Sequence, residues 1–236
     1  MKAWFVAVGW ISLGLGLSGS LSGCSTPASM AANMERARVR LVHLAPDGPA
    51  VDLVIGGKPA IRYVPFGMVS DYVSLPGGQY DVAVQSVSSW FNPRLDGMIA
   101  SAAASLPEFR TMSILVVNES AKMGAVLLDD TVTPLPDQAL VRLVHGIPDA
   151  PPLQWSADQR PIFTDLAFGE VSTYLPMKPG YVSLSIEEGI PTGRELGERE
   201  LQLLPGKAYT IYAAGLLRGE PGVKLVHSED LTTWSP

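Results

Sequence analysis

A set of short motifs occurs twice in this chain, with the same offset between the copies. Val39-Arg40-Leu41-Val42-His43 recurs as Val141-Arg142-Leu143-Val144-His145. Phe66-Gly67-x-Val69-Ser70-x-Tyr72 recurs as Phe168-Gly169-x-Val171-Ser172-x-Tyr174. An offset of about 100 residues is the size of a domain, whereas solenoid repeats are much shorter. The sequence therefore predicts two similar domains in tandem.

Each copy has the pattern of an all-β domain. Short apolar and β-branched runs lie between Gly and Pro turn signals, and Tyr80-Asp81-Val82-Ala83-Val84 alternates so that one face of a strand is buried. About seven short strands in about 100 residues indicate an immunoglobulin-like antiparallel β-sandwich. We place the domains at 38–130 and 139–236, joined by a linker at 131–138. The expected strands lie near 38–44, 51–56, 60–64, 68–75, 79–87, 97–105, 111–118 and 123–129, and near 139–145, 152–155, 161–164, 170–176, 180–187, 196–204, 207–214 and 222–227.

The N-terminal segment has the pattern of an export signal. Lys2 is followed by an uncharged apolar run that is too short for a comfortable membrane span, and small residues follow it. Leu21-Ser22-Gly23-Cys24 then resembles the lipobox of bacterial lipoproteins. That resemblance implies a signal peptide at 1–23, lipid on Cys24 and a tether at 24–37. The alternative is a secreted soluble protein in which Cys24 is incidental.

The same resemblance implies a location. Ser25, rather than Asp, follows the cysteine, which in Gram-negative lipoproteins favours the outer membrane, facing the periplasm or the cell surface. The expected membrane partner is therefore reached through the lipid on Cys24.

Charge and cysteine content exclude several classes of protein. The net charge is −6 and no basic block occurs, which argues against nucleic-acid binding. Cys24 is the single cysteine, so the chain has no intrachain disulfide, and its folded part has no cysteine nucleophile or cysteine-ligated zinc.

The repeated pattern resembles the domain of unknown function 4397 family. The signature runs approximately V-R-x-V-H-x-x-P-D-x-P-x-V-D, followed by F-G-x-V-S-x-Y. The first copy carries it through Asp52, whereas in the second copy Leu153-Gln154 replaces Val-Asp. The resemblance covers nearly all of residues 38–230 and implies β-sandwich modules of exported proteins, with no established reaction and no cofactor.

His43 with Asp47, and His145 with Asp149, are the candidates for acid–base chemistry. Each His ends an expected strand and each Asp lies in a Pro-Asp turn, where Asp side chains commonly bond to backbone amides. We favour a structural role for both pairs, with a binding or catalytic role as the alternative. We therefore assign no catalytic residue.

No ligand cluster predicts a metal site. The three histidines are far apart in sequence, and no EF-hand loop occurs. Asp129-Asp130 precedes the linker, where a calcium ion between the domains is one interpretation and a solvated strand end is the favoured one.

Trp90 and Phe91 lie in an expected loop of the first domain, at a position where the second copy has no aromatic residue. They could contact a ligand, but we favour packing over the sandwich end or against the other domain.

Together these features predict a lipid-anchored envelope protein that acts as a non-enzymatic binding or structural module, with an envelope protein or a glycan as its partner. Two alternatives stay open. One is a small periplasmic hydrolase or metal-dependent enzyme that uses the His/Asp motif, and the other is a carbohydrate-binding module that uses Trp90.

Overall fold

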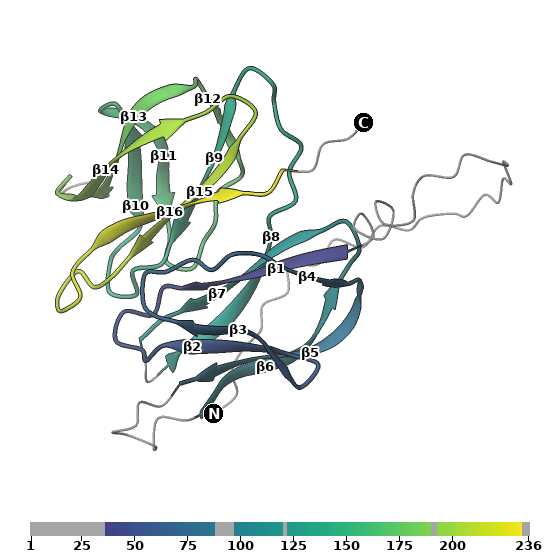
Figure 1. Cartoon of the computed structure of the whole chain (residues 1–236). Helices are drawn as coiled ribbons and strands as arrows, with labels where there is room; N and C mark the ends of the chain where they lie inside the picture. Colours follow the sequence, from purple (N-terminus) through teal and green to yellow (C-terminus); the bar gives the residue numbers. More distant parts are fainter. Residues whose placement is uncertain (1–35, 88–96, 120–121, 190–192, 233–236) are drawn as a thin grey trace, which may run out of the picture.

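The chain folds into β-strands in all the parts that the structure describes (Figure 1). The structure is a computed structural model that describes residues 36–87, 97–119, 122–189 and 193–232. The strands form four sheets of four strands each, which make two β-sandwiches. The predicted all-β fold class is therefore confirmed. No helix long and apolar enough to cross a membrane occurs within these ranges.

The first domain packs two sheets around one apolar core. One sheet has the order β4-β1-β7-β8 and the other has the order β3-β2-β5-β6. Val82 and Val84 of β5 point inward between exposed or half-buried neighbours, as the alternating sequence predicts. The strands are β1 (Arg36–His43), β2 (Val51–Ile55), β3 (Lys58–Val64), β4 (Val73–Pro76), β5 (Gly78–Ser86), β6 (Gly97–Leu106), β7 (Thr111–Val117) and β8 (Gly124–Asp129).

The second domain repeats this arrangement strand for strand. Its sheets have the orders β12-β9-β15-β16 and β11-β10-β13-β14, and the fully buried Trp155 lies in the core between them. The strands are β9 (Ala139–His145), β10 (Leu153–Ala157), β11 (Arg160–Leu166), β12 (Leu175–Met177), β13 (Gly180–Glu188), β14 (Glu195–Leu203), β15 (Ala208–Ala214) and β16 (Lys224–Asp230).

One strand pairing in each domain corrects the expectation of antiparallel sheets. β1 pairs with β7, and β9 with β15, in parallel, whereas all other pairs of these strands are antiparallel. Parallel neighbours cannot be joined by a hairpin, and here β1 and β7 are separated by nearly the whole domain. No local turn signal could therefore have indicated this pairing.

Two predicted strands begin earlier in the sequence than the strands of the structure, β4 and β12. Strands were expected at 68–75 and 170–176, but β4 and β12 are shorter and start later. Gly67 and Gly169 adopt positive φ angles of 74° and 81°, which glycine tolerates and which end an extended run. The F-G-x-V-S-x-Y pattern that the two copies share thus contains a turn, with only single bridges from Val69 and Val171 to the neighbouring strand.

The two sandwiches pack against each other through one sheet of each. The outer faces of β1, β7 and β8 meet those of β9, β15 and β16 (Figure 1). β7 and β15 are buried almost along their whole length, since one face lies in a domain core and the other in this interface. The buried apolar part of the interface consists of Val42, Leu44, Leu115, Val144, Tyr212 and Ala214.

Candidate functional site

Four buried charged side chains of the described residues lie together at this interface between the domains. Arg40 of β1 and Arg142 of β9 come from the repeated V-R-L-V-H motif. Val39 and Leu41, the neighbours of Arg40, point into the core of the first domain. Because side chains alternate along a strand, Arg40 points to the other face, toward the second domain. We call the group formed by Arg40, Arg142, Asp130 and Asp230 the interdomain ionic cluster.

Each arginine of the interdomain ionic cluster reaches the carboxylate of the opposite domain. Arg142 Nη2 donates to Asp130 Oδ1 at 2.5 Å, and its Nη1 donates to the Asp129 carbonyl at 2.9 Å. Arg40 Nη2 donates to Asp230 Oδ1, and its Nη1 donates to the Glu229 carbonyl at 3.2 Å. The two sets of contacts are thus equivalent, because each domain supplies an arginine to the other domain and an aspartate to the other domain's arginine.

A second set of contacts holds each arginine within its own domain. Arg40 Nε donates to Ser113 Oγ at 2.6 Å, and Arg142 Nε donates to Thr210 Oγ1 at 3.1 Å. Ser113 and Thr210 are the direct strand-pairing partners of these arginines in the parallel β1–β7 and β9–β15 ladders. The parallel pairing therefore sets the position of both guanidinium groups.

Tyrosines from the second repeated motif complete the cluster. Arg40 lies 4.6 Å from the ring centre of Tyr72, and Arg142 lies 4.6 Å from that of Tyr174. The Tyr72 hydroxyl donates to Asp130 Oδ2, and the Tyr174 hydroxyl donates to Asp230 Oδ2, each at 2.8 Å. The two repeated motifs of the sequence thus meet at this cluster.

Burial and the facing charged groups together shift the pKa of the arginines and tyrosines in this cluster. All four charged side chains are at most 3% exposed. Burial opposes the charged form of Arg40 and Arg142, but the facing tyrosines and carboxylates outweigh it, so that the pKa of both guanidinium groups is raised. Burial also raises the pKa of Tyr72 and Tyr174, which keeps both hydroxyls protonated as donors.

This arrangement can hold the two domains together, because each arginine bonds to a carboxylate of the opposite domain. Its charges are paired, hydrogen-bonded and hidden from solvent, so none of them faces a substrate. In the described ranges, no group of three or more His, Cys, Asp or Glu side chains could hold a metal ion. The favoured interpretation of Asp129-Asp130 as a solvated strand end is wrong for Asp130, because that residue is fully buried and bonded to both domains.

His43 and His145 are fully buried and make equivalent contacts. Nδ1 of each ring accepts a 3.2 Å hydrogen bond from the backbone N–H two residues later, so Nε2 carries the proton. Nε2 then donates to the carbonyl of Pro49 at 2.8 Å in the first domain, and to that of Pro151 at 3.1 Å in the second. Both ring nitrogens of each histidine are used to hold the loop that follows its strand.

Asp149, the aspartate of the second motif copy, contacts a loop of its domain and not the ring of His145. Asp149 Oδ1 accepts from the Leu217 N–H at 2.7 Å, and its Oδ2 accepts from the Arg218 N–H at 2.9 Å, which fixes the loop between β15 and β16. No hydrogen bond joins Asp149 to His145 among those of the described residues. A binding role for Asp47 stays a prediction.

Three predicted site residues, Cys24, Trp90 and Phe91, lie outside the described residues. Sequence reasoning missed Arg40, Arg142 and Asp230 as members of one site. A signal was present, because an arginine inside an otherwise apolar strand occurs at the same place in both copies. A buried arginine requires a carboxylate partner, but the partner comes from the opposite domain and could not be assigned by spacing.

The sequence matches a known protein family twice. The family described as domain of unknown function (DUF4397) matches residues 37–155 and 139–235, which together cover residues 37–235. The chain belongs to the DUF4397 family. The first DUF4397 match continues past the linker into β9 and β10 of the second domain.

Solved structures add only a weak likeness to the DUF4397 match. A candidate cell adhesion protein from Bacteroides uniformis is 9% identical, with a TM-score of 0.21, and the alignment covers 83% of this chain and 98% of that one. Another from Bacteroides fragilis is 10% identical, with a TM-score of 0.19 and coverage of 85% and 99%. Scores this low carry no argument about function. No curated protein is similar enough to count as a match.

Proposed function

We propose that this DUF4397 protein is a lipid-anchored envelope protein, and that its two sandwich domains act as one non-enzymatic binding or structural module. The observation that carries the proposal is the interdomain ionic cluster, which uses the arginines and tyrosines of both repeated motifs to join the domains. A rigid body on a lipid anchor can hold a binding surface at a set distance and orientation from a membrane.

The histidines support the non-enzymatic part of the proposal. A general base needs a ring nitrogen that can reach a substrate proton. Both nitrogens of His145 are engaged with the Pro151 carbonyl and the Ile147 N–H, and the ring is fully buried. Hydrolysis of an envelope ester or glycan by purified protein, lost in a folded His145→Gln variant, would show that the non-enzymatic assignment is wrong.

The lipobox-like tetrad that ends at Cys24 supports the anchor. The test is to express the full chain and the Cys24→Ala variant in a Gram-negative host, then compare membrane flotation and the mass of the N-terminal peptide. We expect the wild type to float with membranes and to carry a diacylglyceryl-modified Cys24, and the variant to stay soluble. An unmodified Cys24 thiol in the wild type, or equal flotation of both proteins, would overturn the anchor.

A further inference from the structure

The turn between β6 and β7 contains a bulky residue where the equivalent turn of the second domain has glycine. Phe109 has a positive φ angle of 62°, and Gly206, between β14 and β15, has one of 72°. Glycine adopts this conformation freely, whereas for a bulky side chain the strain is about 1–3 kcal/mol. The Phe109 side chain is also 54% exposed, so core packing does not offset its strain.

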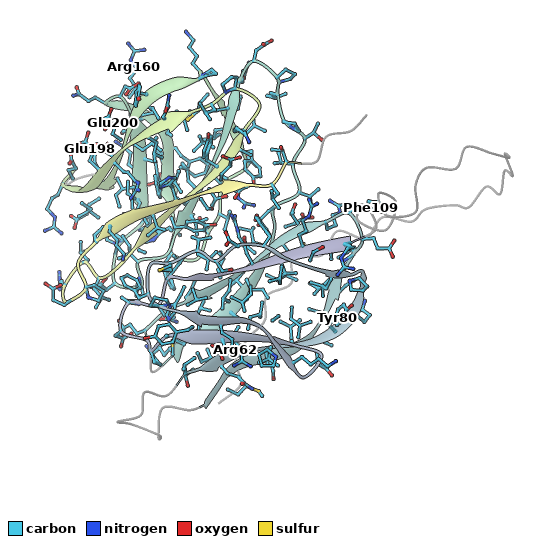
Figure 2. All side chains as sticks on the ribbon, viewed as in Figure 1. Arg62, Tyr80, Phe109, Arg160, Glu198 and Glu200 are labelled. Atoms are coloured by element: carbon cyan, nitrogen blue, oxygen red, sulfur yellow. The ribbon has the colours of Figure 1, made fainter. Side chains whose placement is uncertain are left out.

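This turn lies at the end of the molecule where the chain enters the first domain. The N–H of Arg38, near the start of β1, donates to the Arg110 carbonyl at 2.9 Å. Figure 2 shows Phe109 beside the start of β1. One exposed apolar side chain, that of Phe109, therefore lies near the point where the chain enters the first domain.

The length of the tether relates this end to the membrane. The inference rests on the proposed lipid anchor at Cys24. Residues 25–35 separate Cys24 from Arg36, and even a fully extended chain of that length reaches at most about 40 Å. The start of β1, with the Phe109 turn beside it, would then stay within about 40 Å of the bilayer, which gives this end of the first domain a high effective concentration at the lipid surface.

We propose that the Phe109 end of the first domain rests on the lipid surface to which Cys24 is anchored, with the Phe109 ring inserted at the membrane interface. Burial of one phenylalanine contributes about 1.5–3 kcal/mol, which is too little to bind a soluble protein firmly but enough to orient a tethered one. The interdomain ionic cluster then transmits this orientation to the second domain.

The charges around the turn distinguish this contact from an electrostatic one. Arg36, Arg38 and Arg110 lie at this end together with Glu108 and Asp129, and Arg110 pairs with Asp129 at 3.2 Å. Basic and acidic groups nearly offset each other, so anionic headgroups are not required. The contact should therefore persist in neutral lipid and at high salt.

The two domains offer matched sites for the test. Arg110 and Lys207 occupy equivalent positions after the two turns, and each makes an exposed ion pair, with Asp129 and Glu229 respectively. In the lipidated protein Cys24 is modified, so Arg110→Cys or Lys207→Cys supplies the single free thiol for an environment-sensitive dye. The labelled proteins are anchored in phosphatidylcholine vesicles that contain brominated lipid, which quenches nearby dyes.

We expect brominated lipid to quench the dye at position 110 strongly, and the dye at position 207 hardly at all. Adding Phe109→Gly should abolish the quenching at 110 and leave the protein at least as stable, because glycine relieves the positive φ strain. Equal quenching at the two positions, or quenching at 110 that survives Phe109→Gly, would overturn the proposal.

Two further outcomes keep the inference separate from the anchor. If the unlabelled wild type does not float with vesicles, the anchor itself fails, and the inference fails with it. If the wild type floats but the dye at 110 is not quenched, the anchor stands and this inference alone is wrong.

A dye response at 110 that depends on protein density, and not on brominated lipid, would instead indicate contact with a second copy or another protein. That result would also overturn the proposal.

Discussion

The two buried histidines, His43 and His145, are expected to make this protein less stable in acid. Burial lowers the pKa of both rings, against a weaker effect of the carbonyls that accept from Nε2. A proton added to Nδ1 would also face the backbone N–H that Nδ1 now accepts from. In the unfolded chain a histidine takes up a proton at about pH 6.5, so below that pH the unfolded state binds more protons than the folded state.

The free energy of unfolding is therefore expected to fall as the pH drops below about 6.5, and to change little above it. Urea denaturation at pH 7.5 and 5.5 measures this loss. The loss should be smaller in His43→Gln and smaller again in the variant that also carries His145→Gln. His227, whose pKa is lowered by burial and by Arg199, should supply a residual slope. An unchanged pH dependence in the double variant would contradict this origin.

At the residue scale, the sequence shows which side chains are unusual but not what they contact. The alternation of β1 predicts that Arg40 is opposite to Val39 and Leu41, yet only the second domain explains why that outward face is buried. Asp130 looked like a solvated residue at a strand end, because its position beside a Pro-containing linker gives no sign of a facing sheet. Contacts between domains depend on docking, which has no local sequence signal.

Among the elements, the loop between β15 and β16 depends most clearly on a single residue. Asp149 accepts two backbone hydrogen bonds from it, at 2.7 and 2.9 Å. Asp149→Ala would remove both acceptors and should cost about 1–3 kcal/mol. We expect hydrogen exchange to accelerate in residues 215–222, with β9 and β15 still protected. Asp149→Asn keeps one carbonyl acceptor and should have a smaller effect. Acceleration throughout the second domain would mean that Asp149 supports the fold as a whole.

Strand positions were predictable where one face is buried and the other exposed. β5 and β13 lie within one or two residues of the expected ranges, because period-two alternation identifies such strands directly. β4 and β12 are shorter than predicted, because the apolar residues around Val69 and Val171 suggest a continuous strand there. The turn there depends on the backbone of Gly67 and Gly169, and composition alone does not reveal a φ angle.

For the whole molecule, the interdomain ionic cluster has a cost as well as a benefit. Placing charges in an apolar interface requires them to lose water, and their attraction repays this only when the pairing is complete. Asp230 makes this dependence clear, because it accepts from Arg40 of the other domain and from Thr210 and Tyr174 of its own. Removal of one partner leaves a buried charge exposed to an apolar environment. The cluster should therefore make the two domains unfold together.

We expect Arg40→Met and Asp230→Leu, made separately, each to lower the free energy of unfolding by about 3–5 kcal/mol, because each leaves an uncompensated buried charge. The double variant should lose less than either single variant, since apolar side chains then face each other.

Arg110→Met is the matched control, because its ion pair with Asp129 is about half exposed and should contribute less than about 1 kcal/mol. Chemical denaturation gives these values, and small-angle scattering shows whether the single variants let the domains separate. A double variant that loses the sum of the two single losses would mean that the cluster is not a mutually dependent clamp, and that the domains keep their orientation through apolar packing around Val42 and Val144.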